Sequence, residues 1–428
     1  MPQFRRLWRA LSRGEVLLGG TSGDDGGQVT RASPGLFSRD DLVARGLLVG
    51  WAVVVLVCWV PLQHPISWHW FELSARLLVG DGAPEEGGGG LHLYESHPEF
   101  QFGPVAVVVT AVIRLVGDGH AILLARVLAA ALAPMILWTL EALARREFPP
   151  ADLPRVRRLS LLAGFLLIPA WDLVAVRTVH IDDAIALSAG VGALAMARRD
   201  RPWGTATLLG LAVGAKPWAV AFLPILFVLR RHRTHALALA GVFGSVVWVP
   251  FLVAAPGTVE ALSDYRLSVA RRSALHLLGL DAAAAPMWLR PLQFVAILAV
   301  ATAAVARGRW QGVIFVAMAT RILLDPAVHS YHLTGLVVGA VAWDLTWCQR
   351  KWPIWTISPV LLLTTRLTAL PPSISGAIRL GVSLTIIVAV LAGPGRRIDR
   401  SPEPVVRTQP APDTAPSPAG HDHEQRAG

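Results

Sequence analysis

Two adjacent aspartates lie in the segment of the chain with the clearest potential for chemistry. Asp182 and Asp183 follow His180 and Arg177, and apolar stretches flank the whole group. Ionisable groups at the edge of a membrane helix are costly, so they usually face a cavity or a partner. One aspartate can be explained as a helix N-cap, but two carboxylates and an imidazole exceed what capping needs. We expect the pair to hold an acceptor hydroxyl or a divalent cation, Mg²⁺ or Mn²⁺, and the sequence defines no other cofactor.

Two cations at the ends of other apolar blocks are candidate phosphate ligands. Lys216 lies between two short apolar stretches, where it either snorkels to the membrane surface or binds a lipid-linked phosphate as a point charge. Arg321 lies four residues before Asp325, so the two can simply pair along one helix, or Arg321 can join Lys216 at the phosphate. Arg177 is the third candidate, and His180 is expected to bind substrate beside it.

Candidate bases occur in two places. His329 and His332 follow Arg321 closely, and histidine has a suitable pKa to accept a proton from a hydroxyl. Between the first two apolar blocks, Glu72 is a further candidate base, and His97 and Glu99 are candidate substrate ligands. Carboxylates beside aromatic residues at a membrane surface are partly desolvated, which raises the pKa toward that of a working base. The alternative for all three is a solvated loop.

The elements that must position these residues are membrane helices. Of 428 residues, 54% are hydrophobic and only 16% are charged, and the mean hydropathy is +0.51. Since the apolar residues come in blocks, the composition predicts an all-α, polytopic integral membrane helix bundle. The net charge of +10 does not indicate nucleic acid, because the arginines cluster at block ends. Cys58 and Cys348 suggest neither a disulfide nor a metal cage.

The arginine clusters also predict the topology. These clusters should be cytoplasmic. They lie on the same side of the membrane as the N-terminus only if one of the early apolar blocks does not cross the membrane. Block 103–117 is the best candidate, because it is short, begins with Gly-Pro and ends near Arg114. We therefore expect about 12 crossings in the plasma membrane, with both termini cytoplasmic. Residues 64–119 then form a long first outer loop with interfacial helices, one of them at Trp68–Val79.

Three regions follow from this pattern. Residues 1–46 are predicted to be a disordered basic cytoplasmic arm, and residues 394–428 a disordered cytoplasmic tail. Residues 47–393 form the transmembrane domain. No cleavable signal is evident, because the first apolar block begins near residue 47.

Three short segments carry a resemblance to a known family. They are Leu-Tyr…His-Pro-Glu-Phe-Gln-Phe-Gly-Pro at 93–104, His-Ile-Asp-Asp at 180–183 and Gly-Ala-Lys-Pro-Trp at 214–218. With the long first loop, they resemble GT-C glycosyltransferases, and more closely the actinobacterial polyprenyl-phosphomannose-dependent α-mannosyltransferases, over roughly residues 45–393. The resemblance implies transfer of a sugar, mannose as the best guess, from a polyprenyl-phosphate donor to a lipid or glycan acceptor on the outer face of the membrane.

The chain departs from that family at one point. The family usually carries a catalytic aspartate just after the first crossing, whereas residues 65–72 contain none. The base is then Glu72, His69, His329 or His332, or the protein is impaired. Two other classes remain, a lipid or solute transporter or flippase, and a non-catalytic scaffold of envelope assembly. A transporter predicts internal repeats and charges near the middle of the bilayer, neither of which the sequence displays.

Overall fold

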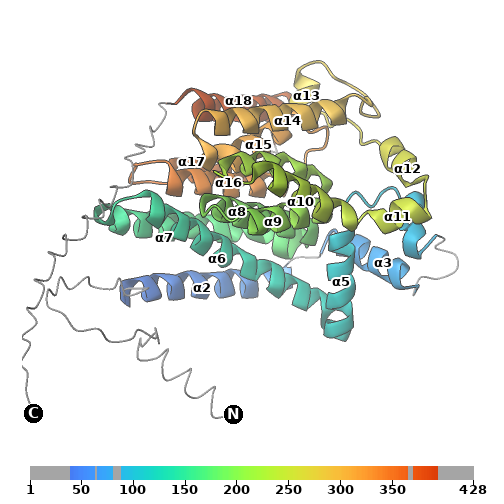
Figure 1. The fold of residues 1–428 in the computed structure, drawn as a ribbon, viewed down its shortest axis with the longest axis horizontal. Coiled ribbons are helices and arrows are strands. Elements are labelled where there is room, and N and C mark those ends of the chain that lie inside the picture. The colour runs from blue at the N-terminus through green and yellow to red at the C-terminus, as the bar shows by residue number, and fades with distance from the viewer. Residues whose placement is uncertain (1–38, 63–64, 81–87, 365–369, 394–428) are drawn as a thin grey trace, which may run out of the picture.

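The computed structural model describes residues 39–62, 65–80, 88–364 and 370–393, which form helices without any strand. This confirms the all-α class. The α-helices are α2 (Arg39–Trp59), α3 (Trp68–Val79), α4 (Leu93–Ser96), α5 (Pro104–Gly117), α6 (Ala121–Glu147), α7 (Leu153–Asp172), α8 (Ile181–Arg198), α9 (Pro202–Ala215), α10 (Arg233–Val246), α11 (Val249–Ala254), α12 (Thr258–Asp264), α13 (Ala274–Leu277), α14 (Leu289–Ala306), α15 (Val313–Leu323), α16 (His332–Thr346), α17 (Ile354–Thr364) and α18 (Pro372–Ala392) (Figure 1). Two other helical elements border the site, the π-helix η6 (Leu173–Thr178) and the 3₁₀-helix η7 (Pro217–Val228).

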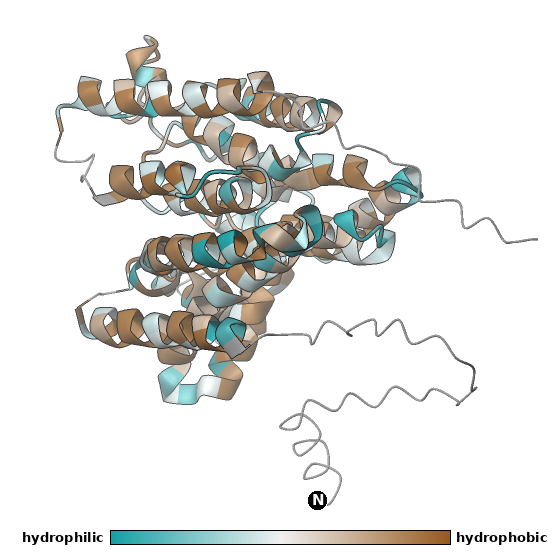
Figure 2. Cartoon of the chain, turned by 90° about the vertical axis from the view of Figure 1, so that its left-hand side faces the viewer, coloured by the Kyte–Doolittle hydropathy of each residue, from teal (hydrophilic) through white to brown (hydrophobic). Residues whose placement is uncertain are grey.

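The helices are apolar enough for a membrane protein. Within the described ranges, five helical stretches have the length and composition to cross a bilayer: Asp40–Leu62, Pro104–Glu147, Pro150–Thr178, Leu289–Ala306 and Pro372–Ala392. Shorter apolar helices accompany them, and Figure 2 shows hydrophobic residues along most of the bundle. Many large apolar side chains are exposed on these helices, which suits a lipid environment rather than water.

Contacts of arginine side chains at helix ends and in the loops between them define one end of the bundle, which we call the basic end. Arg145 at the end of α6 pairs with Asp41 at the start of α2, at 2.6 Å. Arg155 donates a hydrogen bond to the Cys348 carbonyl at 2.8 Å, which joins the α7 side to the loop after α16. Further contacts of this kind are Arg198–Glu147, Arg157–Asp40 and Arg158 over Trp352. The predicted basic clusters that lie within the described residues therefore gather at one end with the start of α2, as the parity argument requires.

Helix α5 lies across the neighbouring helices rather than alongside them (Figure 1). The chain turns after α5 at Asp118, whose φ is 43°, and α6 then enters the bundle. Before α5, the Gly103 N–H donates to the Ala215 carbonyl at 2.8 Å. The apolar stretch Pro104–Glu147 thus contains two helices of different direction. This arrangement supports a block at 103–117 that does not cross, and the side of the membrane stays a prediction.

The first helix begins earlier than predicted, whereas the interfacial helix has its predicted bounds. Helix α2 begins at Arg39, so residues 39–46 are helical, and their assignment to the disordered arm was wrong. The reason is that Asp40 and Asp41 suit the first turn of a helix and have arginine partners there. The rest of the arm, 1–38, and the tail, 394–428, lie outside the described residues. Helix α3 has the bounds expected of the interfacial helix.

Candidate functional site

A strained turn positions the acidic pair. Helix α7 passes into the π-helix η6, and Val179 then has a φ of 53°, in the left-handed region that β-branched residues rarely adopt. The His180 N–H donates to the Val174 carbonyl at 2.9 Å and closes the turn. Helix α8 starts directly afterwards, so Asp182 and Asp183 lie in its first turn, 0% and 3% exposed.

Asp182 accepts a hydrogen bond from a backbone N–H in the first turn of α8 and also pairs with a cation. Its Oδ1 accepts a hydrogen bond from the Asp183 N–H at 2.8 Å and lies 3.3 Å from His180 Nδ1. Its Oδ2 pairs with Lys216 Nζ. Lys216 is only 9% exposed, so it points into the protein and does not snorkel. One oxygen of Asp182 therefore binds the backbone of the first turn, while the other compensates a buried charge.

Asp183 carries an open acceptor atom. Its Oδ1 accepts a hydrogen bond from Trp218 Nε1 at 3.0 Å, and Arg321 Nη1 lies 3.8 Å away. Its Oδ2 is buried without a hydrogen-bond partner. His180 Nδ1 and Lys216 Nζ lie 3.8 and 4.0 Å from that oxygen, too far for hydrogen bonds. Asp172 Oδ2 and Asp344 Oδ1 are also buried without a hydrogen-bond partner, but the Asp183 oxygen lies within 4.0 Å of both an imidazole and an ammonium group, where a substrate hydroxyl could bind.

Arg321 turns toward the acidic pair instead of pairing with Asp325. Its guanidinium lies over the Trp218 ring, 4.3 Å from the centroid. Asp325 pairs with His332 Nδ1 at 2.6 Å. Burial by itself would raise the pKa of Asp325, but His332 and Arg321 lower it, so that the net pKa is below the ordinary value. Arg321 and Asp325 therefore do not pair with each other along one helix. Arg321 contacts Asp183, and Asp325 contacts His332.

His329 remains a free imidazole at the edge of the cluster. Its ring stacks on Tyr331, with centroids 5.2 Å apart, and Tyr331 lies 4.0 Å from the His180 ring. His329 is exposed on one side, and the protein around its other side removes enough water to lower the pKa below the ordinary 6.5; Asp325 opposes the shift, and the cations of the cluster add to it. His329 is therefore neutral at pH 7 and able to accept a proton.

The segment between α2 and α3 reaches the cluster through Ser67. Its Oγ lies 3.1 Å from His180 Nε2, and its N–H donates to the Thr178 carbonyl at 3.2 Å. Phe71 of α3 meets His180 edge-on, at 5.9 Å between centroids. Tyr94 of α4 is fully buried with an unpartnered hydroxyl, and burial together with Asp182 raises its pKa well above the ordinary value. The segment that lacks the family's aspartate thus supplies a serine.

Four predicted site residues do not join the cluster. Glu72 makes no hydrogen bond or ion pair with any residue that the structure describes. Arg177 is exposed. His97 and Glu99 pair with each other at 3.1 Å, and His97 stacks on Phe100. Only the backbone carbonyl of Arg177 contacts this region, as an acceptor for the Ile66 N–H, and a role of its side chain at the phosphate stays a prediction.

Four other residues of the site were absent from the predicted set: Ser67, Trp218, Asp325 and Tyr331. Trp218 and Tyr331 are close in sequence to the predicted residues Lys216 and His332, and this proximity could have placed them at the site. Ser67 had no such signal, because its role depends on how the first loop folds back onto η6.

Asp182 and Asp183 were predicted to be able to hold a divalent cation. Ligand atoms of His180, Asp182 and Asp183 lie within 4.8 Å of one another, and carboxylate oxygens suit a hard cation. However, Lys216 pairs with Asp182, and Arg321 lies beside Asp183, so two cations already balance two carboxylates. A metal would have to displace the lysine. The cation therefore stays a prediction, and the charge balance favours acceptor binding without it.

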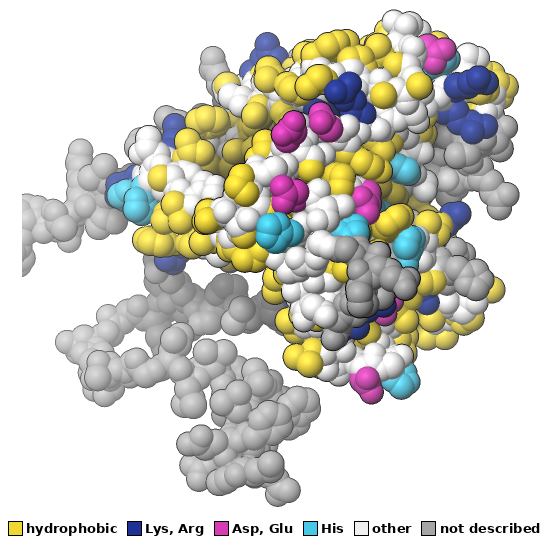
Figure 3. Space-filling model, turned by 90° about the vertical axis from the view of Figure 1, so that its right-hand side faces the viewer, with side chains coloured by type: hydrophobic (Ala, Val, Ile, Leu, Met, Phe, Trp, Pro, Cys, Tyr) yellow, Lys and Arg dark blue, Asp and Glu magenta, His cyan; other side chains and the backbone are white. Residues whose placement is uncertain are grey.

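The cluster lies at the end of the bundle opposite the basic end. Figure 3 views the side of the molecule where α3, α11 and α12 lie, and acidic and histidine side chains gather across the middle of this face, with hydrophobic side chains around them. The buried charges of the cluster lie beneath this face, at one end of an apolar bundle.

Comparison with known proteins defines no family. No family model matches the chain, and no curated protein matches it. The crystal structure of ArnT from Cupriavidus metallidurans bound to undecaprenyl phosphate is similar at a TM-score of 0.45 and 19% identity, covering 83% of this chain and 71% of ArnT. A similarity of this size establishes neither the family nor the substrate of the present protein.

Proposed function

We propose that this protein is a membrane glycosyltransferase of the GT-C type, which moves a sugar from a polyprenyl-phosphate donor to a lipid or glycan acceptor on the outer face. Mannose is the first candidate sugar. The observation that carries the proposal is the open Asp183 Oδ2, buried beside Lys216, Arg321 and His180. Such a set offers cations for a phosphate, an acceptor for a hydroxyl and imidazoles for a proton.

The donor phosphate is assigned to Lys216 and Arg321. Lys216 is a compact point charge, and Arg321 is held in place by its contact with Trp218. The displacement forms a bond between the anomeric carbon and the acceptor oxygen. It breaks the bond between that carbon and the phosphate oxygen, which leaves with the electron pair. The two cations stabilise the charge that develops on the leaving phosphate.

The acceptor hydroxyl is assigned to Asp183 and His329. The open Oδ2 of Asp183 accepts a hydrogen bond from the hydroxyl and orients it. The proton then passes to His329, which is neutral at pH 7 because partial burial lowers its pKa. His332 is less suited to this role, since it is already paired with Asp325 at 2.6 Å. A general base of this kind contributes about 10²–10⁴-fold to the rate.

An apolar groove next to Lys216 suits the polyprenyl tail. It has a volume of about 380 Å³ and is lined by α9, η7, α10 and the start of α11. Its lining is mostly aliphatic, with Leu223, Leu237 and Leu252 among the larger side chains, and Trp248 and Ser245 complete it near α11. Lys216 is the residue between α9 and η7, so a lipid in the groove would have its head group near the cluster.

The proposal is tested by a transfer assay with membranes that contain the full chain. Radiolabelled polyprenyl-phosphate mannose, and then other sugars on the same carrier, are supplied with total lipid extract as acceptor. We expect label in a new lipid or glycan product. Label that remains on the donor but moves to the other leaflet would indicate a flippase. Label unmoved with every donor would contradict the proposal and favour a scaffold.

A further inference from the structure

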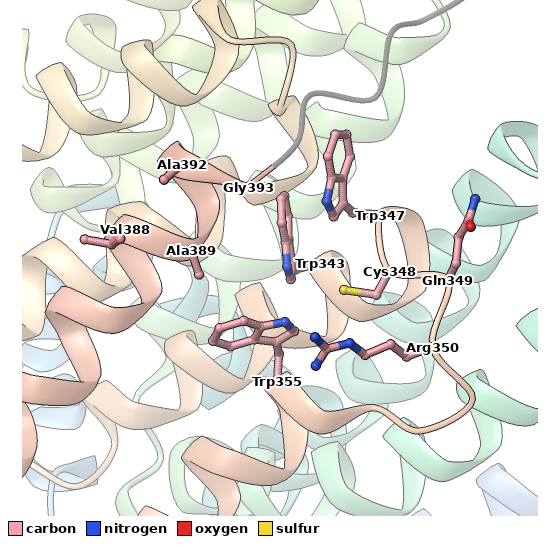
Figure 4. A pocket seen from close by; sticks show the side chains of 10 residues that line it. All are labelled: Trp343, Trp347, Cys348, Gln349, Arg350, Trp355, Val388, Ala389, Ala392 and Gly393. Carbon is pink, nitrogen blue, oxygen red and sulfur yellow. The ribbon is translucent and has the colours of Figure 1, made fainter.

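A second pocket opens at the basic end, between α16, α17 and α18 (Figure 4). Its volume is about 520 Å³, and three indole side chains dominate its walls, Trp343, Trp347 and Trp355. Trp343 and Trp347 stack with ring centroids 5.1 Å apart. Small residues of α18, Ala389 and Ala392, form part of the facing wall. The pocket therefore offers apolar surface and open space together.

Several polar groups of this pocket are hydrogen-bond donors that face one another, while the carboxamide of Gln349 lies farther out. In Figure 4 the indole nitrogens of Trp343 and Trp355 and the guanidinium of Arg350 face the same part of the pocket. Arg350 is exposed and forms no ion pair within the described part of the chain. The acidic residue on α16, Asp344, is 1% exposed and accepts hydrogen bonds from the N–H and hydroxyl of Thr356 on α17. The accessible charge of the pocket is thus positive.

Further cations surround the pocket. Arg155 donates a hydrogen bond to the Cys348 carbonyl at 2.8 Å, which brings the basic start of α7 beside the pocket. Tryptophan is enriched where a membrane meets water, and basic pockets between helices on the cytoplasmic side bind anionic head groups. The combination of indole walls, convergent donors and a basic rim is complementary to a phosphate that carries acyl chains.

We propose that this pocket binds one anionic phospholipid of the leaflet at the basic end. Its phosphate contacts Arg350 and the indole N–H groups of Trp343 and Trp355, and an acyl chain lies against Ala389 and Ala392 of α18. The inference does not depend on the proposed glycosyl transfer, because none of these residues belongs to the acidic cluster.

The test measures lipid retention on the full-length protein in a neutral detergent. Phosphatidylglycerol or phosphatidylcholine is titrated in, and bound lipid is counted by native mass spectrometry. We expect wild-type protein to retain phosphatidylglycerol preferentially. Arg350→Ala should weaken this binding about tenfold, or about 1.4 kcal/mol. Lys351→Ala is the matched control, since that neighbouring cation does not line the pocket, and it should change binding less than about twofold.

A second matched pair tests the walls. Trp347→Leu should weaken retention, whereas Trp352→Leu, outside the pocket and 54% exposed, should not. Equal losses for Arg350→Ala and Lys351→Ala would overturn the proposal in favour of diffuse attraction. Equal retention of both lipids would also overturn it. Displacement of phosphatidylglycerol by millimolar inorganic phosphate would overturn it in favour of a site for the free ion.

Discussion

At the scale of residues, the two neighbouring aspartates have different roles. Asp182 is fully engaged, with one oxygen at the helix start and the other on Lys216. Asp183 keeps one oxygen open beside the same lysine. The Asp183 oxygen makes no hydrogen bond within the described residues, so it can accept one from a substrate hydroxyl without breaking a contact that the fold already uses.

Lys216 is predicted to act in both stability and transfer, and the two effects can be separated. Lys216→Ala leaves Asp182 buried without a partner, which should cost about 3–5 kcal/mol and raise KM for the donor. Lys216→Arg should keep part of the activity. The double variant Lys216→Met with Asp182→Leu replaces the ion pair by apolar groups, so thermal stability should recover while transfer stays lost. Transfer by the double variant at the wild-type rate would return the pair to a structural role.

The pH dependence of transfer should report His329. Partial burial lowers its pKa, so the ring stays neutral to below its ordinary pKa of 6.5 and gains its proton only at lower pH. Activity should therefore be constant on the acid side down to about pH 6.5 and fall as pH drops through the lowered pKa. His329→Gln should reduce turnover about 10²–10⁴-fold and remove this acid limb. An unchanged acid limb in that variant would assign the base elsewhere.

At the scale of elements, the close contact between the first loop and the α9–η7 turn positions Lys216. Gly103 donates to the Ala215 carbonyl at 2.8 Å, directly before the lysine. A Cβ on Gly103 would lie 2.1 Å from the Gly214 carbonyl oxygen, so only glycine allows this approach. The first loop thus contributes to the site by packing as well as through Ser67.

Gly103→Ala is therefore expected to move α5 away from α9. We predict a loss of about 1–3 kcal/mol in stability, as for other overpacked contacts, together with reduced transfer. Gly119→Ala is the matched control at the other end of α5, since no atom lies within 4 Å of its added Cβ. Thermal unfolding and the transfer assay check both variants. Equal behaviour of the two would show that this contact does not position the site.

The sequence predicted the elements better than the contacts between them. Apolar blocks and arginine clusters were sufficient to predict the helices, the shared basic end and an atypical block at 103–117, because hydropathy and charge act locally along the chain. Asp182, Asp183, Lys216 and Arg321 were predicted because buried charges are conspicuous in apolar sequence. Their mutual pairing, and the exclusion of Arg177, depended on the π-helical turn and on Val179, which no local pattern specifies.

At the scale of the whole molecule, the bundle has one basic end and one end with the acidic cluster. The positive-inside rule assigns the basic end to the cytoplasm, so the cluster should face outward, where the long first loop covers it. This assignment depends on α5 not crossing. With this orientation, the phospholipid pocket would lie on the cytoplasmic side of the membrane and the acidic cluster on the outer side.

Cysteine labelling tests this orientation in a background with Cys58 and Cys348 replaced by serine. Ser96→Cys and Gly119→Cys lie on either side of α5, and Arg231→Cys lies between η7 and α10; all three positions are exposed. An impermeant maleimide added to whole cells should label the first two and not the third. Labelling of Ser96→Cys and Gly119→Cys from opposite sides would show that α5 crosses.

The most direct test of the central claim is sugar transfer by Asp183→Asn. Asparagine keeps the shape of the side chain and can still accept the hydrogen bond from Trp218, but it removes a charge that balances Arg321, so the unfolding temperature of the variant is measured beside its activity to establish that it is folded. Asp200→Asn is the matched control, since Asp200 accepts a hydrogen bond from the Arg230 N–H at 2.8 Å and lies at the basic end. We predict that Asp183→Asn transfers sugar at below about a hundredth of the wild-type rate while Asp200→Asn is unaffected. A folded Asp183→Asn protein that keeps more than about a tenth of the wild-type rate would contradict the account.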